Sequence, residues 1–512
     1  MHPKIANYYP FGKKEKRTNY LHLLINLCLL LFICASVYTS LKLNLTDRSL
    51  WLDEAMLAFS FSQRSLPNLT SDIFEWMQSA PVIYLYVVKI ITSLFGNTEF
   101  TLRLWSFISY LLLLVSIYYI SKTILKTKYP LFAVAFIANL SKMIQYSAEF
   151  KPYMSDCLCV CIILIVYHLY TEKKLNQYYT IAIYAIMVWF SNPCCFFIGS
   201  VLLIEFAGGI STKDYAKCRK SVLAGIIILI SFGIYYLYWL KPVIDAGGMT
   251  NFWKDKNFPL IPMSIEDLQR QKSLVKEIIF NLGTYQYLIF SFFGIGVFIN
   301  IFSEKNRFIN VIYAGMLITL FASMLGMYPV QDRLYLFIYP IFSILFFYYL
   351  GKLYSSKPMA NILVVATSCI ILLSTNGVTY FKHEDNVYRL TEEINPAISY
   401  LRESMQADDK LYVYHLSIPA FSYKNEYDTT SFAGNKNNII LGENTFENNQ
   451  NRADIDRIIQ NAPIYILTSH TGEYPERITP LIDGLQKRGN LQLVHNKYET
   501  NTYYFTRNDS VK

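Results

Sequence analysis

The chain has 512 residues, of which 53% are hydrophobic and 16% are charged, with a formal net charge of +9. Soluble domains carry roughly 25% charged residues, so the composition excludes an ordinary soluble protein over most of the length. The basic residues are spread over many short loops between apolar runs, which is typical of the cytoplasmic loops of membrane proteins and not of nucleic-acid binding.

The first apolar run extends from about Leu21 to Leu41 and follows four basic residues, Lys13, Lys14, Lys16 and Arg17. It is too long for the core of a signal peptide, and no small-residue cleavage site follows it. We interpret it as the first membrane span, with the N-terminus in the cytoplasm.

Apolar runs continue to about Tyr380. A helix of about 20 residues crosses the hydrocarbon layer, and basic clusters favour the cytoplasmic side. If every basic cluster is cytoplasmic, the chain crosses an even number of times between successive clusters. Eleven spans satisfy this condition: 20–41, 101–121, 129–147, 155–171, 178–192, 193–208, 221–240, 283–302, 308–327, 335–350 and 359–380. The prediction is a polytopic α-helical membrane protein in which everything after residue 380 is extracytoplasmic.

Residues 81–95 are apolar but short, and Lys89 lies in their middle. A crossing here would place every later basic cluster outside. We therefore predict an amphipathic helix in the outer interface, within a first outer loop over residues 42–100. A second long outer loop is expected over residues 241–282.

Residues 381–512 form a second unit after the membrane module of residues 1–380. Helical and strand patterns alternate, which predicts a small extracytoplasmic α/β domain. The expected elements are helices over 391–407, 446–461 and 475–488, strands over 411–416 and 464–467, and a terminal hairpin over 491–506, with a short apolar run over 439–441. The domain has no cysteine, so no disulfide holds it together. Acceptor binding, a lid and a purely structural role are all open for it.

Two acids, Asp53 and Glu54, open an amphipathic pattern in the first outer loop, directly after Trp51 and Leu52. Carboxylates stabilise helix N-termini, so capping alone explains the pair. The surrounding stretch is apolar and aromatic, however. A partly desolvated carboxylate is more basic and is suited to accept a proton.

Two cations stand at other outer turns. Lys151 lies in the short connector from Glu149 to Asp156, and Arg333 stands at the mouth of a late span. Guanidinium matches phosphate geometry with two parallel hydrogen bonds. The plainer alternatives are a solvated turn for the connector and, for Arg333, a snorkelling side chain paired with Asp332.

Several functional motifs are missing from the sequence: a Walker loop, paired metal-binding histidines, a nucleophile elbow and a dinucleotide glycine fingerprint. Acids are nearly absent from the middles of the spans, where ion-coupled carriers place them. Both observations weigh against a nucleotide-driven or ion-coupled transporter.

The motifs of the outer loops resemble those of a known group. Trp51-Leu52-Asp53-Glu54-Ala55-Met56 resembles the acidic motif of the GT-C superfamily, in the branch of protein O-mannosyltransferases and lipid A aminoarabinose transferases. Three further stretches resemble later motifs of that branch, with Ala80 in place of the first proline: Ser79 to Leu85 with Phe95 to Arg103, Glu149 to Tyr153, and Asp332-Arg333-Leu334. The likeness covers roughly residues 20–350 in order and spacing.

The resemblance implies an inverting glycosyltransferase that moves a sugar from a polyprenyl-phosphate donor to an acceptor at the outer face of the cytoplasmic (inner) membrane. By that resemblance Asp53 would be the general base, and Glu54 would orient Asp53 or the acceptor. The donor phosphate would be bound by Lys151, Arg333 and Tyr153, with Lys89 as a weaker candidate. Glu149, Asp156, Asp332 and Arg103 would support the site.

Two other functions stay open at this point, a flippase or transporter of a lipid-linked saccharide and a polysaccharide ligase or polymerase. The expected partners are the lipid-linked donor, membrane lipid and an acceptor protein, lipid or glycan. No cofactor is required if two cations serve the phosphate, although a divalent metal is possible.

Overall fold

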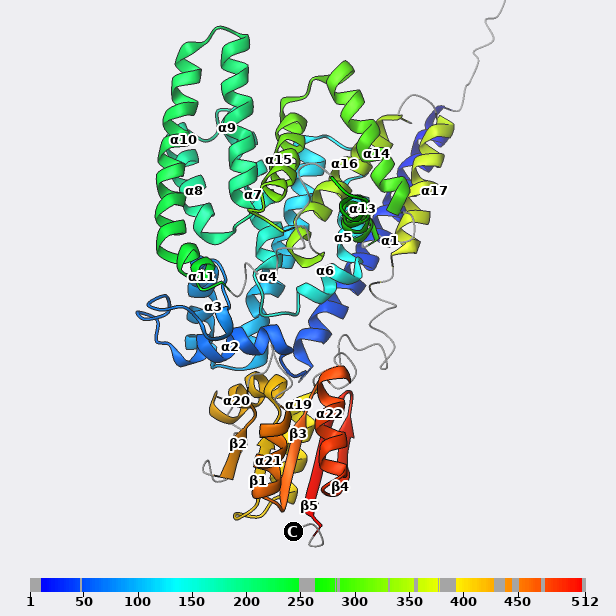
Figure 1. Ribbon diagram of the computed structural model, residues 1–512. Coiled ribbons are helices and arrows are strands. Elements are labelled where there is room, and N and C mark those ends of the chain that lie inside the picture. Colours follow the sequence, from blue (N-terminus) through cyan, green and yellow to red (C-terminus); the bar gives the residue numbers. More distant parts are fainter. Residues whose placement is uncertain are drawn as a thin grey trace, which may run out of the picture.

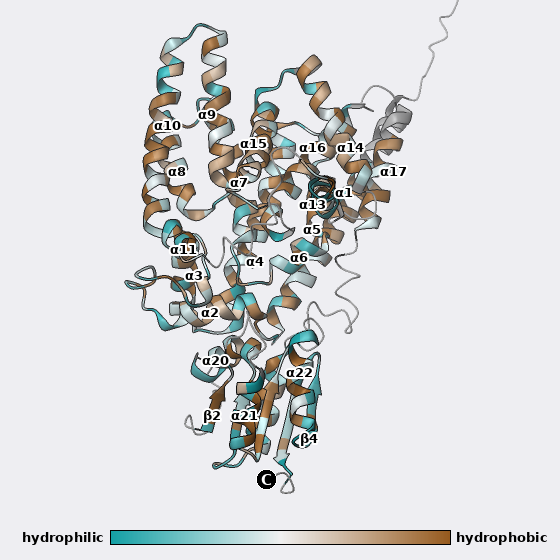
Figure 2. Ribbon diagram, viewed as in Figure 1, coloured by the Kyte–Doolittle hydropathy of each residue, from teal (hydrophilic) through white to brown (hydrophobic). Residues whose placement is uncertain are grey.

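The computed structural model describes residues 11–46, 48–247, 263–280, 282, 286–329, 332–353, 358–375, 377, 393–427, 438–443, 451–470 and 475–508. Figure 1 shows two parts: a large helical body, and a smaller sheet-containing region at the end of that body where α2 lies. Figure 2 shows long apolar faces on the helices of the body and mixed hydropathy in the C-terminal region.

The helices of the body are connected mostly by short turns. Their bounds are α1 Phe11–Leu45, α2 Leu52–Gln63, η1 Glu75–Met77, α3 Val82–Phe95, α4 Glu99–Tyr119, η2 Ile120–Ile124, α5 Pro130–Ala138, α6 Ser141–Tyr146, α7 Tyr153–Thr171, α8 Gln177–Phe190, α9 Cys194–Ser211, α10 Tyr215–Tyr235, η3 Tyr236–Leu240, α11 Lys241–Asp245, α13 Ile265–Phe280, α14 Gln286–Ile299, η5 Asn300–Glu304, α15 Arg307–Met324, η6 Asp332–Tyr335, α16 Ile338–Leu353 and α17 Pro358–Ser374.

Six helices in the described part of the chain are long and apolar enough to cross a bilayer: His22–Leu45, Glu99–Ile124, Tyr153–Thr171, Cys194–Ser211, Tyr215–Asp245 and Arg307–Met324. Shorter apolar helices lie at Val82–Phe95, Gln177–Phe190, Tyr287–Phe302, Ile338–Lys352 and Ile362–Ser374. The chain is therefore a multi-pass integral membrane protein. Four of the shorter helices coincide with predicted spans, and Val82–Phe95 coincides with the predicted interfacial helix.

The predicted span over residues 129–147 is not one continuous helix. The chain breaks between α5 and α6 at Asn139 and Leu140. The Asn139 side chain donates to the carbonyl and hydroxyl oxygens of Thr375, at 3.1 and 2.6 Å, and its own carbonyl accepts from Gly377 N–H. These contacts satisfy the polar groups that a break exposes. Such long-range partners have no signature in the local sequence.

The C-terminal region holds a mixed five-stranded sheet in the order β2-β1-β3-β5-β4. Strands β1, β2 and β3 are parallel, and β5 is antiparallel to β3 and β4. The bounds are α19 Ile394–Ser404, β1 Lys410–Val413, η9 His415–Ser417, α20 Ile418–Tyr427, β2 Ile439–Leu441, α21 Asn451–Gln460, β3 Ile464–Thr468, α22 Pro475–Gln486, β4 Gly489–Lys497 and β5 Thr500–Arg507.

Alternating side chains of the sheet face two different layers. In β1, Leu411 and Val413 pack in a core with α19, whereas Tyr412 packs in a core with α21 and α22. The expected strands and three expected helices are present, and α20 is an additional helix. The predicted division at residues 380 and 381, and residues 248–262 of the predicted second outer loop, lie outside the described residues.

The C-terminal region shares a hydrophobic core with the first outer loop. Leu50 and Ala55 from the loop, and Ile394, Leu401 and Phe421 from the C-terminal region, belong to one buried cluster. Helix α20 therefore packs against α2 (Figure 1). This packing places the sheet region directly beside the residues predicted to carry the chemistry.

Candidate active site

Asp53 lies in the first turn of α2, at the edge of the helical body. Its Oδ2 lies 2.6 Å from Arg333 Nη2, and the two side chains are 21% and 17% exposed. Arg333 comes from η6, which directly precedes α16. Two residues about 280 positions apart in sequence thus form a half-buried ion pair, which is accessible enough to exchange partners.

Aromatic rings surround the Arg333 guanidinium. Its Cζ atom lies 5.3 Å from the ring centroid of Trp51 and 6.0 Å from that of Tyr153. Cations are stabilised over such rings when water is excluded. Burial alone lowers the pKa of Arg333, but Tyr153 and Asp53 outweigh that effect, so the pKa lies above its usual value. The cation is therefore permanent.

Lys151 approaches the same place from the connector between α6 and α7. It is 5% exposed, and its Nζ donates to Gln78 Oε1 at 2.8 Å. Ser106 Oγ donates to the carbonyls of Glu149 and Lys151, at 2.6 and 3.2 Å, which fixes the connector on α4. Burial lowers the pKa of Lys151, while Asp53 raises it and Arg333 lowers it further.

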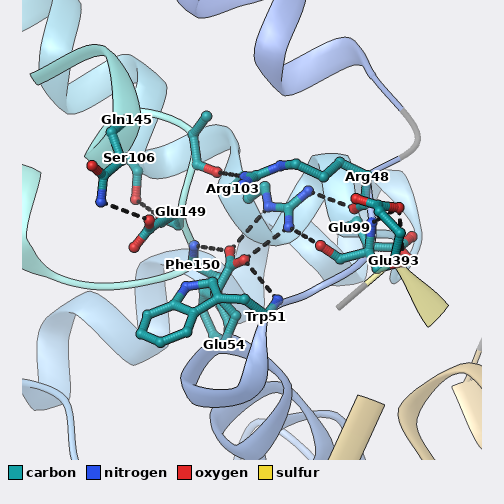
Figure 3. A network of polar contacts seen from close by, with 12 residues as sticks. Arg48, Trp51, Glu54, Glu99, Arg103, Ser106, Gln145, Glu149, Phe150 and Glu393 are labelled. Atoms are coloured by element: carbon teal, nitrogen blue, oxygen red, sulfur yellow. Dashed lines mark hydrogen bonds and ion pairs between the residues drawn. The ribbon is translucent and has the colours of Figure 1, made fainter. Parts of the chain in front are cut away.

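Glu54 has a different environment from its neighbour Asp53 (Figure 3). It is fully buried, and its carboxylate accepts from Arg103 Nε at 2.9 Å and Arg103 Nη2 at 2.8 Å. It also accepts from the Phe150 and Trp51 N–H groups, at 2.6 and 3.4 Å. Burial raises the pKa of Glu54, but Arg103, Arg48 and the Phe150 N–H together lower it below its ordinary value, so the carboxylate stays ionised.

These contacts determine what Glu54 can do. A fully buried carboxylate that is bonded on both oxygens has no surface for an acceptor. The predicted role in orienting an acceptor therefore finds no support in its position. Its contacts with the Trp51 and Phe150 N–H groups join the first loop to the connector.

Three of the four predicted supporting residues, Arg103, Glu149 and Asp156, have described side chains, and all three are buried. Arg103 donates to the Arg48 and Ser49 carbonyls, each at 2.9 Å. Glu149 is fully buried and accepts from Gln145 Nε2 at 3.2 Å. Asp156 is buried in the first turn of α7. For Asp332 the structure describes the backbone in η6 but not the side chain.

Lys89 lies apart from this cluster. Its Nζ donates to the Phe61 carbonyl at 3.2 Å and stands 4.8 Å from the centroid of the Phe61 ring. Its role as a phosphate ligand stays a prediction that its contacts in the structure do not support.

Comparison with known proteins decides the class of the enzyme. Residues 79–239, which contain Arg103, Lys151 and Tyr153, match the sequence model of the family described as dolichyl-phosphate-mannose-protein mannosyltransferase. Over these residues the chain is similar to a family of membrane glycosyltransferases. Enzymes of this family use polyprenyl-phosphate-linked sugars. The predicted family and enzyme class are confirmed. A search of curated proteins gives no match.

Solved structures share the fold of this chain. ArnT from Cupriavidus metallidurans bound to undecaprenyl phosphate matches with a TM-score of 0.57 at 10% identity, over 93% of this chain and 97% of that chain. The same protein in the apo state gives 0.56 at 10% identity, over 95% and 98%. The Archaeoglobus fulgidus oligosaccharyltransferase, in complex with Zn and sulfate, gives 0.51 at 11% identity, over 93% and 73%. At these identities the likeness is one of fold.

The sequence alone did not identify three residues of the candidate site. Gln78 accepts a hydrogen bond from Lys151, and the Trp51 ring lies beside the Arg333 guanidinium. Trp51 is the first residue of the acidic motif that carried the family resemblance, and Gln78 directly precedes the Ser79-Ala80-Pro81 stretch. Ser106, one helical turn after Arg103, gave no signal because a serine inside an apolar helix has many uses.

The acids of the site bear on a metal requirement. Within the described ranges no group of three or more His, Cys, Asp or Glu side chains is close enough together to hold a metal ion. The side chain of Asp332 is not among those described, so this finding concerns the remaining acids only.

Proposed function

We propose that the chain is an inverting glycosyltransferase in which Asp53 is the general base and Arg333, Lys151 and Tyr153 bind the donor phosphate. The observation that carries the proposal is the ion pair between Asp53 and Arg333 beside Tyr153. Asp53 and Lys151 interact electrostatically as well. A base and two cations therefore meet at one place, which is the set of groups that phosphate departure requires.

The ion pair indicates how the donor prepares the site. The Asp53 carboxylate and a donor phosphate compete for the same guanidinium. A phosphate bound by Arg333 with two hydrogen bonds releases the carboxylate. Asp53 is then free to accept the proton of an acceptor hydroxyl. Base activation is in this way coupled to donor binding.

The reaction follows from this arrangement. The acceptor oxygen attacks the anomeric carbon from the side opposite the phosphate while Asp53 takes its proton. The bond between the anomeric carbon and the phosphate oxygen breaks through an oxocarbenium-like state. Polyprenyl phosphate leaves with the electron pair, and Arg333 and Lys151 stabilise its charge. The configuration at the anomeric carbon is inverted.

The donor carries a polyprenyl tail in this proposal, in keeping with the undecaprenyl phosphate named for the similar ArnT structure. The acceptor is a hydroxyl-bearing protein, lipid or glycan at the outer face of the cytoplasmic membrane. Because two cationic side chains neutralise the phosphate, we expect turnover to persist in EDTA.

The test uses purified protein in lipid nanodiscs with a panel of radiolabelled polyprenyl-phosphate sugars and membrane extract as acceptor. We expect release of free polyprenyl phosphate, and its loss by at least about 100-fold in D53N, a range typical of a lost general base. The matched control is D72N, because Asp72 is an exposed acid of the same loop whose carboxylate accepts from the neighbouring Ser71 hydroxyl.

Two results would contradict the proposal. An active D53N protein would exclude Asp53 as the base. No turnover of any donor, together with directional movement of lipid-linked sugar in vesicles, would favour lipid transport.

A further inference from the structure

A polar network joins the C-terminal region to residues 48–56, named here the catalytic loop because they contain Asp53 (Figure 3). The Ser49 N–H and hydroxyl both donate to Glu393 Oε2, at 3.3 and 3.2 Å. The Ser49 hydroxyl in turn accepts from the Asn395 N–H at 3.0 Å. Ser49 and Glu393 are 4% and 7% exposed, so water competes little for these bonds.

A second polar contact lies beside the first. Lys424 Nζ stands 2.6 Å from Glu99 Oε1, and both side chains are 9% exposed. Asn395 Nδ2 donates to the same Glu99 oxygen at 3.4 Å. Together with the apolar packing of α20 on α2, these bonds fix where the segment after residue 393 meets the membrane module.

The network continues from Ser49 to the reacting groups. The Ser49 carbonyl accepts from Arg103 Nη2, and Arg103 binds Glu54 with two further hydrogen bonds. Glu54 is the neighbour of Asp53 in the first turn of α2. It also accepts from Phe150 N–H, and Phe150 is the neighbour of Lys151. A chain of buried bonds thus runs from Glu393 to both sides of the site.

We propose that the C-terminal domain positions the catalytic loop through Glu393, which acts on Asp53 by way of Ser49, Arg103 and Glu54. The inference rests on the proposed function, because it takes Asp53 as the reacting base. It assigns the C-terminal domain a task in catalysis in addition to acceptor binding or support. Glu393 is a positioning residue, since its bonds are to Ser49 and not to the reacting groups.

The first test compares E393A and E393Q in the full-length protein in nanodiscs. Alanine removes the acceptor for both Ser49 donors, whereas glutamine keeps an acceptor oxygen. We expect the kcat of E393A to fall roughly 10- to 100-fold, the range that a small misplacement of a reacting group produces. E393Q is expected to recover most of that loss.

The KM for the donor is expected to change little, because Gln78 and Ser106 hold Lys151 independently of Glu393. The matched control is D456N. Asp456 forms an exposed ion pair with Arg488 in the same domain, at 3.2 Å, and its loss should leave kcat unchanged.

The second test measures backbone amide exchange by mass spectrometry and needs no donor. In E393A we expect faster exchange in residues 48–56, with the connector around Lys151, the strands of the C-terminal sheet and the Tm unchanged. A purely structural role predicts faster exchange throughout the C-terminal sheet and a lower Tm instead.

Two outcomes overturn the inference. One is E393A with the kcat and loop exchange of the unmodified protein. The other is a loss that glutamine does not recover and that accompanies faster exchange across the whole domain. If the unmodified protein turns over no donor, the proposed function fails, and the exchange measurement still decides whether Glu393 orders the loop.

Discussion

At the scale of single residues, Asp53 and Glu54 are neighbours in sequence with opposite environments. Asp53 is partly exposed and paired with the Arg333 guanidinium, whereas Glu54 is fully buried and bonded on both oxygens. Successive residues of a helix point about 100° apart, so one faces the site and the other faces the loop interior. Their different surroundings give them different roles.

The lowered pKa of Lys151 predicts that kcat/KM for the donor depends on pH. Burial lowers its pKa below that of a free lysine, near 10.4. It therefore loses its proton, and with it the charge that stabilises phosphate, at a lower pH than a free lysine. We expect kcat/KM for the donor to fall on the alkaline side below about pH 10.4, and the fall to move to higher pH in K151R, because arginine stays charged.

The measurement is a pH profile of polyprenyl phosphate release for both proteins. K151R is expected to have a lower maximum, since the longer side chain has to fit beside Gln78. An alkaline limb at the same pH in both proteins would assign that limb to another group.

At the scale of elements, the Glu54 to Arg103 pair joins three segments: α2, α4 and the connector before α7. Removing one partner of a buried pair leaves the other charge uncompensated, which costs about 3–5 kcal/mol. We therefore expect E54Q to lower the Tm and the yield of folded protein strongly, whereas D53N leaves both near those of the unmodified protein. Thermal unfolding in detergent, followed by tryptophan fluorescence, measures the difference.

The Glu54 to Arg103 pair also predicts how the stability of the folded protein changes with pH. The pKa of Glu54 in the folded protein lies below its ordinary value. Its stabilising contribution is therefore complete above the ordinary pKa of about 4.3 and is lost as the pH falls through the folded value. A Tm of E54Q equal to that of D53N at neutral pH would show that the pair does not stabilise the fold.

At the scale of the whole molecule, the orientation in the membrane decides where the reaction takes place. We expect the C-terminal domain to lie outside the cell and the basic loop between α9 and α10 to lie in the cytoplasm. In K487C a membrane-impermeant maleimide should label intact cells, whereas in K213C it should label only permeabilised cells. Both lysines are exposed. The unmodified protein, with its native cysteines, provides the background, and the reverse pattern would place the site in the cytoplasm.

The sequence by itself determined the class of this protein. The length of an apolar run and the positions of basic clusters can be read from the local sequence, so most predicted spans coincide with observed helices. The strands β1 and β3 were predicted for a similar reason, because a short apolar run between two helical patterns is a local signal. Asp53, Lys151, Tyr153 and Arg333 could be named because each lies within a short motif at an outer loop.

Only the tertiary structure decided how these residues meet. The pairing of Asp53 with Arg333, the burial of Glu54 against Arg103 and the separate position of Lys89 all depend on contacts between distant segments. The break at Asn139 and the bond of Ser49 to Glu393 do as well. A buried polar group is satisfied by whichever partner the packed chain brings to it, and that choice leaves no mark in the local sequence.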